Sequence, residues 1–113
     1  MTAGRGSGRR LWRLDTKASI EAGNPVLFVE GRLGHHAAAE LEAAVNRHLS
    51  DTAGDVIIDM SGVDYVSSAP LKLFAALADR LSEKGGRLRL REPSVSARLA
   101  LELAGLQALV DSV

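Results

Sequence analysis

The sequence predicts an α/β fold, an open mixed β-sheet of four to five strands with helices packed mainly on one face. A short apolar run over Val56–Met60 precedes a loop and an amphipathic helix, and a strictly alternating strand over Arg87–Arg91 follows. A strand–helix–strand crossover of this kind is right-handed, so we expect the two strands to be parallel neighbours. The leucine and arginine alternation of the second strand indicates a sheet with one covered face and one largely solvated face.

The central stretch reads as strand, loop and helix. Val56–Met60 is β-branched, bounded by acids and too short for a membrane span, which is typical of a buried strand. A polar loop follows and ends in Ser67-Ser68, and an apolar face at helical spacing runs from Leu71 to Leu81. The two serines are therefore predicted at a helix N-terminus, where unpaired N–H groups donate hydrogen bonds either to a capping hydroxyl or to a phosphate. Both interpretations are open at this point.

Composition favours one small binding domain. A chain of 113 residues predicts a single core, and a formal net charge of zero gives no sign of direct nucleic-acid binding. The absence of cysteine excludes disulfides and thiolate chemistry in this sequence. No apolar segment approaches the roughly 20 residues of a membrane span. We expect a soluble, cytoplasmic protein.

The N-terminal part is predicted as an arm and a hairpin. Residues 1–10 are rich in glycine and arginine and are expected to form a mobile arm, which leaves residues 11–113 as the domain. Leu11–Lys17 alternates like an edge strand, with Trp12 as a core anchor. We expect a hairpin to a second strand at Val26–Val29.

Turn residues and a helix follow the first strand. Gly23, Asn24 and Pro25 are predicted to form the hairpin turn, and Gly31 to end the second strand. His36–Leu49 has the apolar stripe of an amphipathic helix. The histidines near its ends have no carboxylate at a ligand-like spacing, so no metal site is expected.

The C-terminal part predicts one more strand and helix. Gly85-Gly86 is typical of a helix end, and Leu88 and Leu90 are expected to face the helices, with the alternating arginines on a wet face. Pro93-Ser94 opens a short helix, and Gly105 closes it. Its predicted buried stripe consists of Val95, Leu99 and Leu103. Residues 106–110 are expected to pack back as a last turn or a short strand.

No residue set indicates catalysis. Asp55, Asp59 and Asp64 flank the central strand and loop without a histidine or lysine at a reactive spacing. The sequence contains neither a G-x-S-x-G elbow nor a P-loop, a G-x-G-x-x-G or an H-E-x-x-H motif. We therefore expect no catalytic residue, no cofactor and no enzymatic activity.

An ordered set of motifs resembles a known family. The matching pieces are Asp59-Met60-Ser61-Gly62-Val63, Tyr65-Val66-Ser67-Ser68-Ala69-Pro70-Leu71, Gly85-Gly86-Arg87-Leu88 and Leu103-Ala104-Gly105-Leu106, with Glu30-Gly31-Arg32-Leu33 upstream. In this order they are similar to the STAS domain of bacterial anti-sigma factor antagonists. The resemblance covers nearly all of the chain from about Leu11 to Val113.

The resemblance implies a phosphorylation switch in a regulatory binding protein. Members bind an anti-sigma factor that is also a serine kinase, which frees a sigma factor for transcription, and phosphorylation of one serine ends the partnership. By position the phosphoacceptor is Ser68, with Ser67 as second choice. The implied partner-binding residues are Tyr65, Ser67, Ser68, Ala69, Pro70, Leu71, Lys72 and Ala75. The implied assembly is a monomer or weak homodimer, without a membrane span.

Two positions keep an alternative open. Gly34 stands where the family often has aspartate, and Pro70 stands where it has glycine. Proline fixes φ and carries no N–H, although the first turn of a helix accommodates it. These positions favour a STAS domain that binds constitutively as a structural or scaffold subunit of a signalling or lipid-transport assembly.

Overall fold

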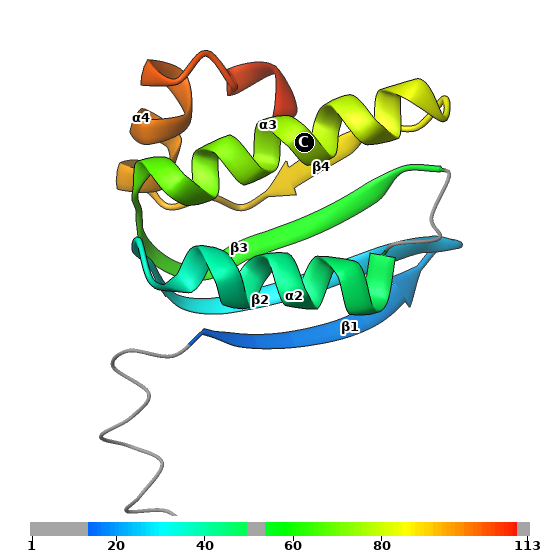
Figure 1. The fold of residues 1–113 in the computed structure, drawn as a ribbon, viewed down its shortest axis with the longest axis horizontal. Helices are drawn as coiled ribbons and strands as arrows, with labels where there is room; N and C mark the ends of the chain where they lie inside the picture. The colour runs from blue at the N-terminus through cyan, green and yellow to red at the C-terminus, as the bar shows by residue number, and fades with distance from the viewer. Residues whose placement is uncertain (1–13, 50–53, 111–113) are drawn as a thin grey trace, which may run out of the picture.

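The computed structural model describes residues 14–49 and 54–110. They form a four-stranded open sheet in the order β1-β2-β3-β4, and Figure 1 shows how the helices are arranged on it. The strands are β1 (Asp15–Glu21), β2 (Asn24–Leu33), β3 (Val56–Val66) and β4 (Leu88–Arg91). The helices are α2 (Ala37–Leu49), α3 (Ser68–Glu83), α4 (Val95–Leu103) and the 3-10 turn η1 (Gln107–Leu109). The predicted fold class is confirmed. The predicted arm and the Trp12 anchor lie outside the described residues.

The predicted hairpin is present with different bounds. β1 pairs antiparallel with β2, and Glu21 lies opposite Asn24, so the turn consists of Ala22 and Gly23 alone. Both have positive φ, 52° and 84°, which suits the right-handed twist of the flanking strands. The prediction that Gly31 ends the second strand is wrong. β2 continues to Leu33, and Gly31 stays in it with a φ of 124° that a glycine readily adopts.

The predicted polar loop before the serines is wrong as well. β3 is one strand of 11 residues that runs from Val56 to Val66. In its second half the buried residues are Met60, Val63 and Val66, a spacing that does not alternate. The β2–β3 pairing shifts register twice in this region, and such irregularities change which face a side chain meets. Because of these shifts, buried and exposed residues do not alternate in the second half of β3, and alternation is the pattern from which a strand is predicted.

The helices bury one continuous core against the sheet. Leu27 and Ile58 from the sheet, Leu41 from α2, Phe74 from α3 and Leu101 from α4 belong to one buried cluster. Parallel pairing of β3 with β4 and burial of both leucines of β4 confirm the predicted crossover. The core thus holds the carboxyl ends of β2 and β3 and the helix starts that follow them in one fixed arrangement.

The predicted buried stripe of α4 is wrong. Val95, Leu99 and Leu103 are exposed, whereas Ala97 and Leu101 are buried. Both sets recur every four residues, so periodicity alone does not choose between the two sides of the helix. Two polar contacts set the orientation: the Ser94 hydroxyl accepts a hydrogen bond from the Ala97 N–H, and the Ser96 hydroxyl donates one to the Asp64 carbonyl.

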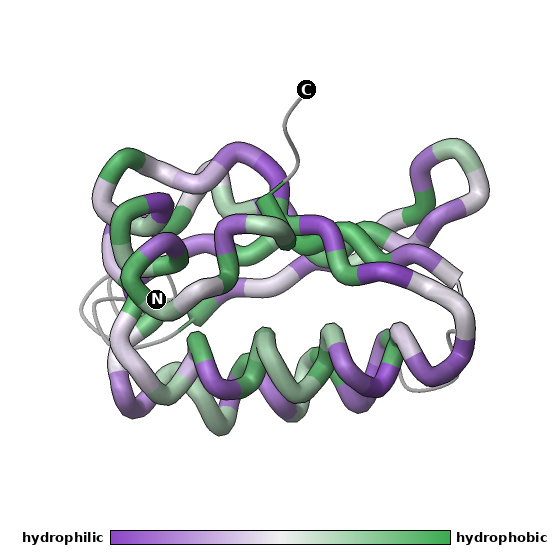
Figure 2. The backbone as a smooth tube through the Cα atoms, turned by 90° about the horizontal axis from the view of Figure 1, so that it is seen from above, coloured by the Kyte–Doolittle hydropathy of each residue, from purple (hydrophilic) through white to green (hydrophobic). Residues whose placement is uncertain are grey.

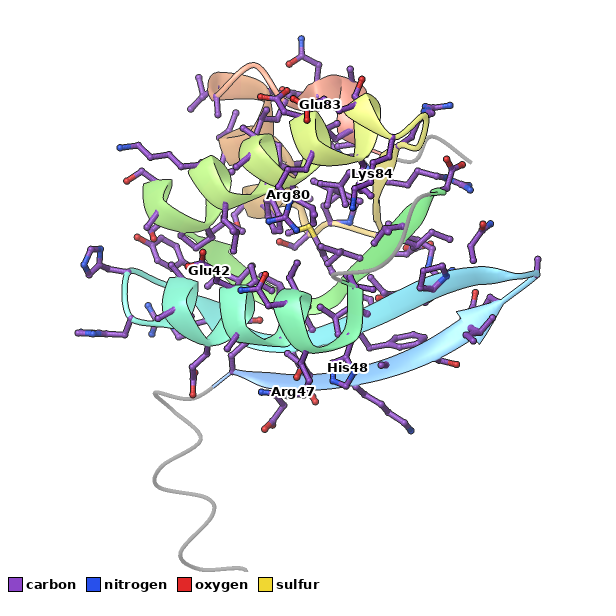
Figure 3. All side chains as sticks on the ribbon, turned by 45° about the vertical axis from the view of Figure 1, so that its right-hand side comes forward. Glu42, Arg47, His48, Arg80, Glu83 and Lys84 are labelled. Carbon is purple, nitrogen blue, oxygen red and sulfur yellow. The ribbon has the colours of Figure 1, made fainter. Side chains whose placement is uncertain are left out.

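The outer sides of the other helices are polar. Figure 3 labels exposed side chains of α2 and of the C-terminal end of α3, and they are charged or polar: Glu42, Arg47, His48, Arg80, Glu83 and Lys84. Figure 2 shows the same mixture as alternating purple and green along α2.

The segment predicted as a last turn or a short strand contains both features. The 3-10 turn η1 is followed by a β-bridge from Val110 to Leu90.

Candidate functional site

The serine pair lies at the edge of the sheet where the parallel strands end. Figure 1 shows the N-terminal ends of α2, α3 and α4 together at this edge. The backbone N–H of Ser67 donates a hydrogen bond to the Leu33 carbonyl at 2.8 Å, so the end of β2 holds the residue that precedes α3. In open α/β sheets, ligands bind at the carboxyl ends of the strands. The junction therefore occupies the edge where a binding site is expected.

Ser67 does not cap α3 with its side chain. It is the N-cap residue and has extended backbone, yet it makes no side-chain cap hydrogen bond. Its hydroxyl oxygen is buried, and it finds no hydrogen-bond partner among the described residues. A buried hydroxyl without a partner costs free energy. The capping interpretation is wrong for Ser67.

Ser68 presents its side chain to solvent. It is the first residue of α3 and is exposed, as is Lys72 one turn further along the helix. Side chains four residues apart lie on the same face of a helix. Pro70 is buried in the first turn, where its missing N–H would have had no partner within the helix.

The remaining residues of the predicted partner surface divide by exposure. Ala69, Leu71 and Ala75 are half-buried, and Leu71 packs against the core. Tyr65 is 45% exposed at the end of β3. Among the predicted partner residues, the exposed ones are thus Tyr65, Ser68 and Lys72.

Arg32 is a neighbour of this surface that was not predicted. Its guanidinium carbon lies 5.6 Å from the centre of the Tyr65 ring, within cation–π range. A Cβ built on Gly34 would lie 3.9 Å from the same ring, so a side chain there would contact the Tyr65 edge. The Glu30-Gly31-Arg32-Leu33 motif is the sequence feature that could have indicated Arg32. In this motif Arg32 precedes Leu33, whose carbonyl accepts the hydrogen bond from the Ser67 N–H.

A second polar cluster lies on the helix-free face of the sheet. Asp59, 7% exposed, accepts hydrogen bonds from the Ser61 hydroxyl at 2.6 Å and from the Arg91 Nε at 2.8 Å. Arg91 also donates to Glu21 at 2.8 Å, and its guanidinium carbon lies 5.7 Å from the centre of the Phe28 ring. Arg91 is therefore a paired residue, and the predicted row of solvated arginines is wrong at this position.

The pKa values of this cluster reflect its pairing. Burial alone would raise the pKa of the Asp59 carboxyl, but hydrogen bonds from Ser61 and Arg91 outweigh it and hold that pKa below its ordinary value. The hydrogen bond from Arg91 lowers the pKa of Glu21. Bonds to both carboxylates raise the pKa of Arg91. All three groups are held in their charged forms.

The same face is hollowed beside the cluster. The hollow measures about 430 Å³ and is lined by β1, β2 and β3, with Lys17, Phe28 and Asp59 among its walls. Asp59 lines the hollow with a carboxylate that already accepts three hydrogen bonds, from the Ser61 N–H, the Ser61 hydroxyl and the Arg91 Nε. Within residues 14–49 and 54–110, histidine and acidic side chains do not gather in a metal-binding group of three. None of the helices described is long and apolar enough to cross a bilayer.

Comparison with known proteins identifies the family to which this fold belongs. Residues 16–111 match the protein family described as "Mlab, STAS domain". A curated relative, the anti-sigma-F factor antagonist RsfB of Mycobacterium tuberculosis, is 31% identical over 61 residues, which span 54% of this chain and 50% of the relative. The match thus spans about half the length of that relative.

Solved structures share the fold. An anti-sigma factor antagonist from Mycobacterium paratuberculosis superposes with a TM-score of 0.78 at 24% identity, covering 88% of this chain and 86% of the other. The anti-sigma factor antagonist SpoIIAA in its unphosphorylated form gives a TM-score of 0.74 at 19% identity, covering 88% of each chain. With the family match over residues 16–111, the chain belongs to the STAS domain family.

Proposed function

We propose that this STAS domain is an anti-sigma factor antagonist, a binding protein rather than an enzyme, and that phosphorylation of Ser68 switches it. The observation that carries the proposal is the exposed Ser68 hydroxyl on the first residue of α3, beside a Ser67 hydroxyl that is buried. The RsfB and SpoIIAA relatives, which are named as antagonists, support the same class. The proposed partner is an anti-sigma factor that is also a serine kinase.

The two serines differ in what a kinase can reach. The Ser67 oxygen is buried, so phosphorylation there would require the β3–α3 junction to open. The Ser68 side chain requires no such change, because it lies on the surface at the helix start. Ser68 is therefore the proposed acceptor, and Ser67 becomes the control position.

The surroundings of Ser68 suit a phosphate. A phosphoserine carries about −1.5 to −2 charges at neutral pH, and the N-terminus of a helix favours negative charge. Lys72 lies one turn further on the same helix face, where it can pair with the added charge. The same charge would repel a partner that docks across Tyr65, Ser68 and Lys72 in the unphosphorylated state. Addition of phosphate is thus proposed to end the complex.

The test is an intact-mass measurement with a kinase that binds the protein. The kinase is isolated by affinity capture from native lysate and incubated with ATP and the full chain. We expect a mass gain of one phosphate in the wild type and in Ser67→Ala, and no gain in Ser68→Ala. Persistence of the gain in Ser68→Ala, or its absence from the wild type with every bound kinase, would refute the switch.

A second candidate is a STAS scaffold subunit that binds its partner constitutively. Pro70 favours it, because a proline in the first turn of α3 leaves one backbone donor fewer for a phosphate. On this candidate, Ser68→Asp leaves partner affinity unchanged, whereas Lys72→Glu weakens it. A Ser68→Asp that abolishes binding would decide for the switch.

A further inference from the structure

α4 has a row of large, exposed apolar side chains, and no such side chain is exposed on α2 or α3. Val95, Leu99 and Leu103 are 87%, 55% and 81% exposed, and they follow one another at four-residue spacing. We call these three residues the α4 ridge. Three large apolar side chains in one row indicate a surface that another molecule covers. Figure 1 shows α4 beside the N-terminal half of α3 and away from α2.

We propose that a second copy of this chain covers the α4 ridge, in an antiparallel, two-fold symmetric pair of α4 helices. Rows of residues four apart are the ridges by which helices most commonly pack on one another. Leu99 lies midway between Val95 and Leu103. A two-fold axis at Leu99 therefore places Val95 of one copy beside Leu103 of the other, and the ridge is complementary to itself.

The charges beside the ridge favour the same arrangement. Arg98 and Glu102 form the neighbouring row on α4; both are exposed, and they make no ion pair with each other or with the rest of the described chain. In a two-fold antiparallel pair, corresponding flanks meet and run in opposite directions. Arg98 of each copy then lies beside Glu102 of the other, which forms two ion pairs across the interface.

The size of the ridge sets the strength of the pair. Stable interfaces bury about 800 Å² on each partner, and one helix of nine residues supplies only part of that area. We expect a reversible dimer with a dissociation constant on the order of 100 µM. The proposal does not rest on the proposed phosphorylation switch, because neither Ser68 nor its neighbours take part in it.

The first test uses the absence of cysteine from the chain, which makes any introduced thiol unique. Facing Cα atoms at a helix crossing lie roughly 3.4–5.4 Å apart, a range that overlaps the spacing of disulfide-linked residues. Leu99→Cys on the two-fold axis is expected to oxidise to a covalent dimer. Ala43→Cys, on the exposed side of α2, is the matched control. Equal cross-linking of the two variants would overturn the proposal.

The second test asks whether the α4 ridge drives association. Sedimentation equilibrium of the full chain is expected to show a mass that rises with concentration from one chain toward two. Leu99→Glu is expected to weaken association at least tenfold by placing two carboxylates on the axis, while Ile20→Glu, an exposed apolar residue of β1, leaves it unchanged. Circular dichroism checks that both variants are folded.

Charge reversal separates a second copy from any other occupant. Arg98→Glu and Glu102→Arg are each expected to weaken the dimer, and the double variant is expected to restore it, because only a self-complementary interface regains both pairs. Failure of the double variant to restore association overturns the antiparallel pair. A chain that stays monomeric at millimolar concentration also overturns the proposal. If the ridge residues are then needed for binding another protein, that protein and not a second copy covers the ridge.

Discussion

Two of the strand-to-helix junctions, β3–α3 and β4–α4, have a serine immediately before the helix and use it differently. At the β4–α4 junction the Ser94 hydroxyl accepts a hydrogen bond from the Ala97 N–H at 3.2 Å. At the β3–α3 junction Ser67 has similar extended backbone, but its hydroxyl is buried and bonds to nothing in the described part of the chain. A serine at the N-cap position therefore does not by itself show that its side chain caps the helix.

The difference shows how each helix is held. α4 packs on the core through Leu101, and two polar contacts fix its start, the Ser94 cap and the Ser96 bond to Asp64. α3 is held by packing of the fully buried Phe74 in its second turn and by the backbone hydrogen bond from Ser67 to Leu33. The start of α3 thus has no hydroxyl cap of its own, and it is the junction at which a phosphate is proposed.

The largest expected effect concerns the contact that joins the strands of the two junctions. Asp59 of β3 is bonded to Arg91, the last residue of β4, and we expect Asp59→Asn to lower the free energy of unfolding by about 2 kcal/mol through loss of charged hydrogen bonds. Urea denaturation at neutral pH measures it. Asp79→Asn, an exposed change on α3, serves as control and is expected to have almost no effect.

The same contact predicts a pH dependence. Because the folded pKa of Asp59 lies below its unfolded value, its stabilising effect is present above the unfolded pKa of about 4 and is lost as the pH falls through the folded pKa. Wild type should lose stability in that acid range, and Asp59→Asn should lose less. Glu21, whose pKa is also lowered, leaves a residual slope in the variant. Parallel stability curves for the two proteins would show that Asp59 is not held by these bonds.

A smaller effect is expected at the β4–α4 junction. Ser94→Ala removes the cap of α4 and should cost about 1 kcal/mol. The midpoint of urea unfolding should fall without a change in slope. Ser82→Ala, near the exposed end of α3, is the matched serine control. If Ser94→Ala costs no more than the control, the Ser94 bond does not stabilise the helix.

The smallest effect is expected at the β3–α3 junction. Ser67→Ala removes a buried hydroxyl without a described partner, so stability should stay unchanged or rise by about 0.5 kcal/mol. The same denaturation experiment measures it beside Ser94→Ala. A loss as large as that of Ser94→Ala would mean that the two junctions are held alike, and the comparison would fail.

The element order could be predicted from sequence because it depends on local patterns. The helix predicted from His36 begins at Ala37, and both end at Leu49. The parallel pairing in the crossover followed from the strand–helix–strand order and its usual right-handed connection, and β4 was indicated by its strict alternation. The serine pair was placed correctly at a strand-to-helix junction, because the change of period marks that point.

The parts that could not be predicted depend on partners far along the chain. The second half of β3 was missed because its burial pattern follows register shifts against β2. The buried side of α4 was missed because Ala97 and Leu101 recur at the same spacing as the exposed ridge. The pairing of Arg91 with Asp59 requires the β3–β4 register, in which these two residues are opposite each other. Whether Ser67 caps its helix depends on a side-chain orientation that no sequence pattern records.

The bridge between Leu90 and Val110 also makes the two edges of the sheet unequal. Val110 occupies the outer side of β4 at one point, while β1 has no further strand beside it among the described residues. An open edge is a template for unwanted strand addition between molecules. β1 has the sequence Asp-Thr-Lys-Ala-Ser-Ile-Glu, with a charge at each end and a lysine near its middle. The charged residues of β1 disfavour strand addition at one edge of the sheet, and Val110 covers part of the other edge at β4.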